Sequence, residues 1–147
     1  MEILTRQVSR RLHEEHQATL ALWTRLEAAL AAGRADAALL RAAAASLADE
    51  IERHFAFEEK ELFPRLAAAG EGDIAALLEE EHVTIRAAAE LFIVAVKNDA
   101  LDPNLKPLGL ELAERLVSHV QKEEMSMLPA LDDLLDQETD DALAAAY

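Results

Sequence analysis

The chain has 147 residues, 52% of them hydrophobic, which fits one folded domain over residues 1–147 and excludes a disordered chain. Its 14 Lys and Arg against 29 Asp and Glu give a formal net charge of −15, so we expect no nucleic-acid partner, because phosphate contacts need clustered basic residues. Cysteine is absent, which excludes disulfides, thiolate zinc sites and cysteine nucleophiles.

Four long helices are predicted in chain order, because Ala, Leu, Glu and Arg dominate and favour helix. The first covers about 5–32 and ends before a turn at Gly33. The second starts after Asp36, a plausible N-cap, and ends near Gly70. The third covers about 74–97 with Asp73 as its cap, and the fourth covers about 105–136 after a break at 98–104.

Two prolines, Pro64 and Pro129, lie inside the second and fourth helices, where we expect a kink or an early stop. Residues 140–147 are expected to be a frayed or docked end. No segment alternates with a period of two, which predicts no sheet. The expected fold is therefore all-α, an antiparallel up-down-up-down four-helix bundle.

The two halves of the chain resemble each other as a helix pair used twice. His16 and His82 are 66 positions apart, and His54 and His119 are 65 positions apart. Each of the last two is followed ten residues later by a proline. The fold is thus predicted to have an internal helix-pair repeat that puts four histidines at related positions.

Helical spacing places these histidines on the inward faces of their helices, with a glutamate one turn after two of them. The predicted metal-ligating residues are His16, His54, Glu58, His82, His119 and Glu123. Burying a carboxylate is costly unless it is paired or bound to a metal, and Arg86 is the one basic residue expected to be able to reach inward. Two metal ions would satisfy the set, and imidazole with bridging carboxylate suits iron, with manganese or zinc as alternatives.

Four further residues have open roles. His13 is interpreted as a flanking polar residue, with a fifth imidazole ligand as the alternative. Glu61 shares the inward face of its helix and is a candidate extra ligand. Glu15 and Glu81 each precede a histidine and point about 100° away around the helix. They are therefore expected either to lie in solvent or to contact the metal-ligating residues without binding the metal.

With these motifs the chain resembles the hemerythrin family, specifically the bacterial group with the HHE cation-binding domain. The resemblance implies a bundle around a non-haem, oxo- or hydroxo-bridged diiron centre. It makes the four histidines terminal ligands and Glu58 and Glu123 the bridges. Oxygen-carrying hemerythrins have a second histidine where this chain has Arg86, and an aspartate where it has Glu124. Glu124 is therefore an alternative bridge, although Glu123 repeats the spacing of Glu58.

One imidazole fewer leaves more open coordination positions, which favours reactive chemistry or iron handling over reversible oxygen carriage. The first functional hypothesis is a diiron protein that binds or senses dioxygen or nitric oxide, with an unidentified redox or protein partner. The second is a diiron redox enzyme that turns over ferrous iron, peroxide or nitric oxide, or repairs iron centres. The third is storage or sensing of another metal. The longest apolar runs, such as 91–96, are shorter than the ~18 residues that span a membrane, so we expect a cytoplasmic protein with no membrane partner.

Overall fold

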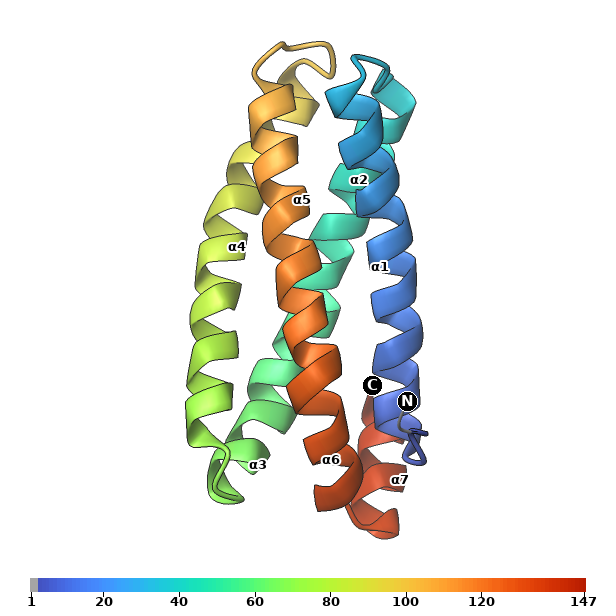
Figure 1. The fold of residues 1–147 in the computed structure, drawn as a ribbon, viewed down its shortest axis with the longest axis vertical. Coiled ribbons are helices and arrows are strands. Elements are labelled where there is room, and N and C mark those ends of the chain that lie inside the picture. The colour runs from blue at the N-terminus through green and yellow to red at the C-terminus, as the bar shows by residue number, and fades with distance from the viewer. Residues whose placement is uncertain (1–2) are drawn as a thin grey trace.

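The computed structural model describes residues 3–147 and confirms the prediction of an all-helical protein, with no strand in that range. Long helical rods lie alongside one another (Figure 1). Their segments are α1 (Gln7–Ala31), α2 (Ala37–Asp49), the π-helical η1 (Glu50–Phe55) and η2 (Glu58–Leu62), α3 (Phe63–Ala68), α4 (Gly72–Asn98), α5 (Leu105–Lys122), the π-helical η3 (Glu123–Met127), α6 (Leu128–Leu134) and α7 (Gln137–Ala146).

The helix limits agree with the sequence prediction to within a few residues, with one wrong cap. The Asp36 side chain accepts a hydrogen bond from the Leu39 backbone N–H at 2.8 Å, so the predicted N-cap of α2 is confirmed. Asp73 does not cap α4, because the helix already starts at Gly72 and Asp73 lies in its first turn. An acidic residue is favourable there, beside the positive end of the helix.

The two helix-internal prolines widen their helices instead of ending them. Pro64 and Pro129 lie in the first turns of α3 and α6, directly after the π-helical segments η2 and η3. Proline has no N–H and its ring collides with the carbonyl four residues earlier, so a wider turn before it relieves the conflict. Backbone angles at Leu62 stay right-handed at φ −102° and ψ −49°. The predicted early stop of these helices is therefore wrong. The π-helical turns that replace it contain Glu58 and Glu123.

The tail, expected to be frayed or docked, forms a docked helix that the sequence analysis did not predict. Asp136 caps α7 by accepting from the Thr139 backbone N–H at 2.7 Å. The buried Asp140 accepts from the backbone N–H groups of Gln7 and Val8 at 2.9 and 3.0 Å. These are free donors at the start of α1, so the tail is fixed to the first helix.

The helices pack in a ring: α1 packs against α2 and α5, and α4 packs against α2, α3 and α5. The connections after α1 and α4 lie at one end of the molecule, and the connection between α3 and α4 lies at the other (Figure 1). Two apolar clusters fill the interior, one around Trp23, Leu47 and Phe92 and one around Leu12 and Leu66.

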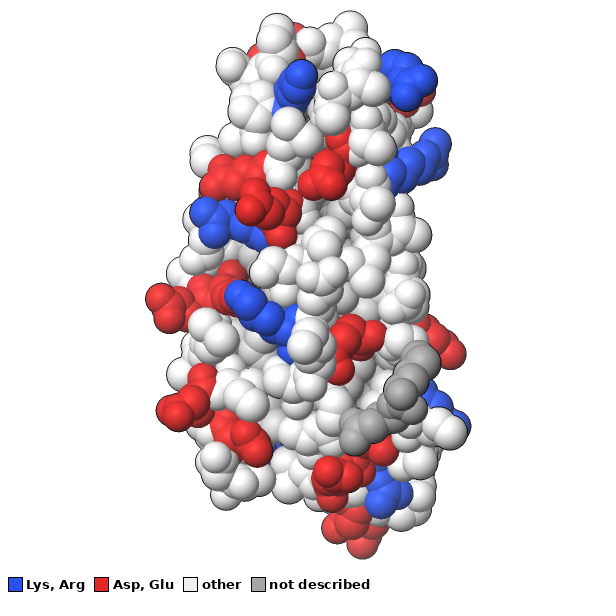
Figure 2. Space-filling model, viewed as in Figure 1, with Lys and Arg blue, Asp and Glu red and all other residues white. Residues whose placement is uncertain are grey.

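The molecular surface is strongly charged. Figure 2 shows acidic side chains along the length of the visible face, with basic side chains between them. Within residues 3–147, every helix is too short or too polar to span a bilayer.

Candidate metal centre

The six predicted metal-ligating residues lie together in one buried pocket. Their exposed fractions are between 0% and 2%: His16, His54, Glu58, His82, His119 and Glu123. They come from all the long helical rods, with the histidines on α1, η1, α4 and α5 and the glutamates on η2 and η3. Side chains of this polarity are rarely buried together unless a partner satisfies them.

The pocket has two overlapping halves. One half contains His16, His54, Glu58 and Glu123, and the other contains His82, His119 and the same two glutamates. In each half, one potential ligand atom from every residue lies within 4.8 Å of the others. Each half therefore offers two imidazole nitrogens and two carboxylate oxygens, a donor set that suits iron, zinc or manganese.

Both glutamates extend across the two halves. Glu58 places Oε2 3.2 Å from His54 Nε2 and Oε1 3.2 Å from His82 Nε2. Glu123 places Oε1 2.9 Å from His16 Nε2 and Oε2 3.3 Å from His119 Nε2. Each carboxylate thus directs one oxygen to each histidine pair, which is the disposition that a bridging ligand needs.

Several polar atoms in the pocket lack a hydrogen-bond partner, and a bound cation would be a partner for them instead. Glu58 Oε1 and Glu123 Oε2 are buried without a hydrogen bond among the described residues. The Nε2 atoms of His82 and His119 face each other at 3.1 Å. An unpaired buried carboxylate oxygen costs free energy, and a bound metal ion would remove this cost. The residues present therefore fit a metal site.

Each buried histidine is held from outside by a carboxylate on a neighbouring helical rod. The Nδ1 atoms lie 2.7 to 3.0 Å from carboxylate oxygens in the pairs His16–Glu124, His54–Glu15, His82–Glu59 and His119–Glu81. A carboxylate only accepts, so each Nδ1 carries a proton, and the lone pair of each Nε2 points into the pocket once that nitrogen is deprotonated. This is the orientation that a metal-binding imidazole needs.

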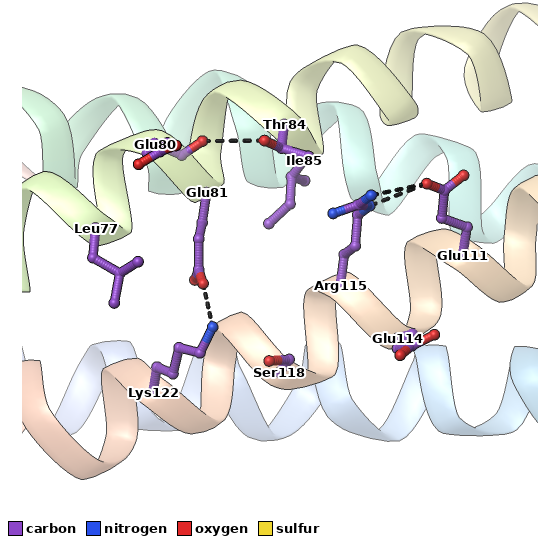
Figure 3. Close-up of a pocket in the computed structure, with 10 residues that line it drawn as sticks. All are labelled: Leu77, Glu80, Glu81, Thr84, Ile85, Glu111, Glu114, Arg115, Ser118 and Lys122. Carbon is purple, nitrogen blue, oxygen red and sulfur yellow. Dashed lines mark hydrogen bonds and ion pairs between the residues drawn. The ribbon is translucent and has the colours of Figure 1, made fainter.

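Every outer carboxylate also has a basic partner nearer the surface. The pairs are Glu15–Arg53, Glu59–Arg86, Glu81–Lys122 and Glu124–His13. Four chains of histidine, glutamate and base therefore run outward from the pocket. Their histidine–glutamate pairs follow the helix-pair repeat, whereas the basic residues lie at unrelated positions. Figure 3 shows one outer end, where Glu81 and Lys122 meet in a groove between α4 and α5.

These contacts locate the residues whose roles were open. Glu124 lies on His16 Nδ1 and belongs to neither ligand group, unlike Glu123. His13 faces Glu124 and not the pocket, and Glu61 binds Arg65 at 3.0 Å. Arg86, thought able to reach inward, instead binds Glu59. Glu15 and Glu81 are around the histidines and not in bulk solvent, with about a fifth of each side chain exposed.

The contacts set the charge of the pocket without metal. Burial lowers the pKa of His119, but the Glu123 charge and the hydrogen bonds that His119 donates to Glu123 and Glu81 outweigh it and raise the pKa to about 10. The same balance, with Glu123 and Glu124, raises the pKa of His16 to about 9. Burial raises the pKa of Glu123, but His119 and His16 lower it well below its usual range. Without metal, His16 and His119 are therefore protonated and positively charged at neutral pH, and they balance the charge of Glu123.

Several residues around the site were missed by the sequence analysis. Glu59 directly follows Glu58 as Glu124 follows Glu123, so the repeat did carry a signal for it. Glu50 is buried, accepts from Thr19 Oγ1 at 3.3 Å and lies 3.7 Å from His54 Nδ1. Tyr147 places its hydroxyl on Glu15 at 2.5 Å, a contact between chain ends that no local pattern indicates.

The fold and the pocket define an all-helical protein with a buried His/Glu centre of the kind that holds metal cations. Residues 7–131 match the family model described as the hemerythrin HHE cation-binding domain. This match covers most of the chain, and the protein belongs to the hemerythrin HHE family. No curated protein and no solved structure matches the chain.

Proposed function

We propose that this hemerythrin-family protein holds two iron ions between its histidine pairs and binds or senses dioxygen or nitric oxide, or handles iron, through that centre. The proposal takes the fold to be an antiparallel four-helix bundle with an internal helix-pair repeat. His16 and His54 would hold one ion, His82 and His119 the other, and Glu58 and Glu123 both. When bound, iron supplies reversible redox chemistry and open positions for a diatomic ligand.

The single observation that carries the proposal is the way the two carboxylates are shared. Glu58 and Glu123 each present one oxygen to each histidine pair, at 2.9 to 3.3 Å from the nearest imidazole nitrogen. Four protein ligands per ion are fewer than the six positions of octahedral coordination. The open positions of a bound ion would lie in a water-poor interior, because two apolar clusters fill the rest of the protein core.

The chain's own residues would orient and protect the centre. The outer carboxylates hold each imidazole in the tautomer that presents Nε2. Phe55 stacks on the His82 ring at 3.8 Å between ring centres, with an angle of 2° between the planes. This contact fixes the ring and excludes water from its face.

Elemental analysis of protein from iron-replete cells, combined with its visible spectrum, tests the proposal. We expect two iron ions per chain and the absorption of a bridged diiron centre. Glu58→Gln and Glu123→Gln are each expected to reduce the content to one ion or fewer. Glu61→Gln is the matched control, since Glu61 binds Arg65 outside the pocket, and it should keep both ions. A folded wild-type protein that retains at most one metal ion under these conditions refutes the two-metal function.

The second candidate is a diiron redox enzyme acting on ferrous iron, peroxide or nitric oxide, or repairing iron centres. The observation in its favour is that Arg86 binds Glu59 at 2.9 Å, so this position offers no fifth imidazole. Mixing the ferrous protein with dioxygen or nitric oxide separates the two functions. A spectral change that reverses when the gas is removed supports binding, whereas continued consumption beyond one event per site supports an enzyme.

A further inference from the structure

Among the four outer carboxylates, Glu15 has one contact that the others lack. Each of the four outer carboxylates binds one histidine and one basic side chain, as described above. Glu15 has an additional donor, because the Tyr147 hydroxyl donates to Glu15 Oε1 at 2.5 Å. The same hydroxyl lies 3.2 Å from His54 Nδ1. Tyr147 therefore contacts one histidine–carboxylate pair of the four.

Tyr147 is held rigidly in this position. Its ring stacks on Phe57 with 4.3 Å between centres and 13° between the planes. The guanidinium groups of Arg11 and Arg53 lie over the ring at 4.3 and 5.1 Å. Stacking and cation–π contacts on one aromatic ring restrict its rotamers, so the hydroxyl is fixed on Glu15.

The residue is brought to the site by a part of the chain outside the family match. The match ends at residue 131, whereas α7 begins at Gln137. Asp140 docks α7 on the first backbone donors of α1, one helical rod away from His54. The tail therefore adds a contact to the metal pocket that residues 7–131 alone do not contain.

The physical effect follows from competition for one carboxylate. A carboxylate that accepts from imidazole Nδ1–H draws that proton and makes Nε2 a stronger electron donor to a metal. Every further donor on the carboxylate spreads its negative charge and weakens this effect. Glu15 accepts from Arg53 and Tyr147, and Arg11 Nε lies 3.7 Å away. Glu50 lies 3.7 Å from His54 Nδ1, farther than the 3.0 Å of Glu15, so Glu15 controls that proton.

We propose that Tyr147 is a positioning residue that makes the two metal positions unequal, by weakening His54 as a donor so that the His16/His54 half binds its ion less tightly. This inference rests on the proposed two-metal function. The His82/His119 half then fills first, and the ion beside Tyr147 is the one that exchanges.

Cobalt(II) titration of the metal-free protein tests this inference without relying on any activity. The wild type is expected to bind two ions in steps of different affinity. Tyr147→Phe keeps the ring on Phe57 and removes the donor, so the weaker step should become about tenfold tighter while the stronger step is unchanged. Lys122→Met removes the donor from Glu81 in the other half and should tighten the stronger step instead.

The outcomes separate the two proposals. Fewer than two bound ions in the wild type would contradict the two-metal function. Two bound ions with Tyr147→Phe affinities that are unchanged, or weaker at both steps, would leave that function intact and overturn the role of Tyr147. Circular dichroism checks folding. If Tyr147→Phe loses helix content, Arg53→Met removes the other strong donor from Glu15 and must tighten the same step.

Discussion

The four buried histidines show how single residues prepare the pocket for a cation. His119 donates Nδ1–H to Glu81 at 2.9 Å, and Glu81 is in turn paired with Lys122. The glutamate fixes the tautomer and increases the basicity of Nε2. Hydrogen bonds with His119 and Lys122 together lower the pKa of Glu81 despite its partial burial, so the glutamate is ionised at the rim of the pocket.

At the residue scale we predict that Glu81→Gln weakens metal binding without unfolding the protein. A neutral amide draws the His119 proton less strongly, so the affinity of the His82/His119 half should fall by about tenfold or more. Competition titration against a metal chelator measures this change.

The control for this variant lies in the same groove. Glu111 binds Arg115 at 3.0 Å (Figure 3), and it has no hydrogen bond to a histidine among the described residues. Glu111→Gln makes the same chemical change and should leave the affinity unaltered. Equal losses in the two variants would mean that groove charge in general, and not the contact with His119, determines the affinity.

At the element scale, the first helix depends on the last two for its start. Arg6 at the N-cap of α1 makes no capping bond. Asp132 of α6 accepts instead from the backbone N–H groups of Thr5 and Arg6 at 2.9 and 2.8 Å, and Asp140 of α7 accepts from the next two. Carboxylates at a helix N-terminus satisfy free donors and complement the helix dipole. The chain ends are therefore joined through the start of α1.

We predict that Asp140→Asn lowers the free energy of unfolding by about 1–2 kcal/mol, because one of the two backbone donors that Asp140 satisfies at the start of α1 loses its acceptor. Urea denaturation of the metal-free protein gives the value. Asp133→Asn is the control, since Asp133 is exposed and next to the other capping residue, and its effect should stay within about 0.5 kcal/mol. A loss as small as that of the control would show that α7 does not stabilise α1.

At the scale of the whole molecule, the pocket links stability to pH and metal. Without metal, the pKa values of His16 and His119 are raised to about 9 and about 10, above the ~6.5 of an unfolded histidine. A raised folded-state pKa stabilises the protein fully below the unfolded value. That stabilisation is lost as the pH rises through the folded value, so it disappears between about pH 6.5 and 10.

We therefore predict that the melting temperature of the metal-free protein falls between pH 7 and 10, while metal affinity rises, because binding must displace these protons. The metal-loaded protein should lack this fall, since its imidazoles are already deprotonated at Nε2. At a free metal concentration a thousandfold above Kd, binding adds about 4 kcal/mol of stability. Calorimetry at several pH values checks both curves, and identical curves with and without metal would contradict the link.

The sequence was sufficient for much of the fold and pocket because both depend on local spacing. The positions of His54 and Glu58 one turn apart, and their copies His119 and Glu123, follow from a period of 3.6 residues and a repeat of 65. Burial of these residues follows from the apolar stripe around them. The π-helical turns could not be predicted from the sequence, since Pro64 indicates an irregular helix but not whether the helix stops or widens.

The sequence by itself thus determined the helical class and the set of buried residues, because periodicity records which side of a helix faces inward. Only the tertiary structure decided which glutamate meets which histidine, as in the pairs Glu15–His54 and Glu124–His16. It also decided that α7 brings Tyr147 to Glu15 across 132 positions of sequence. Such contacts depend on the rotation and axial offset of packed helices, and these are set by side-chain packing over the whole bundle.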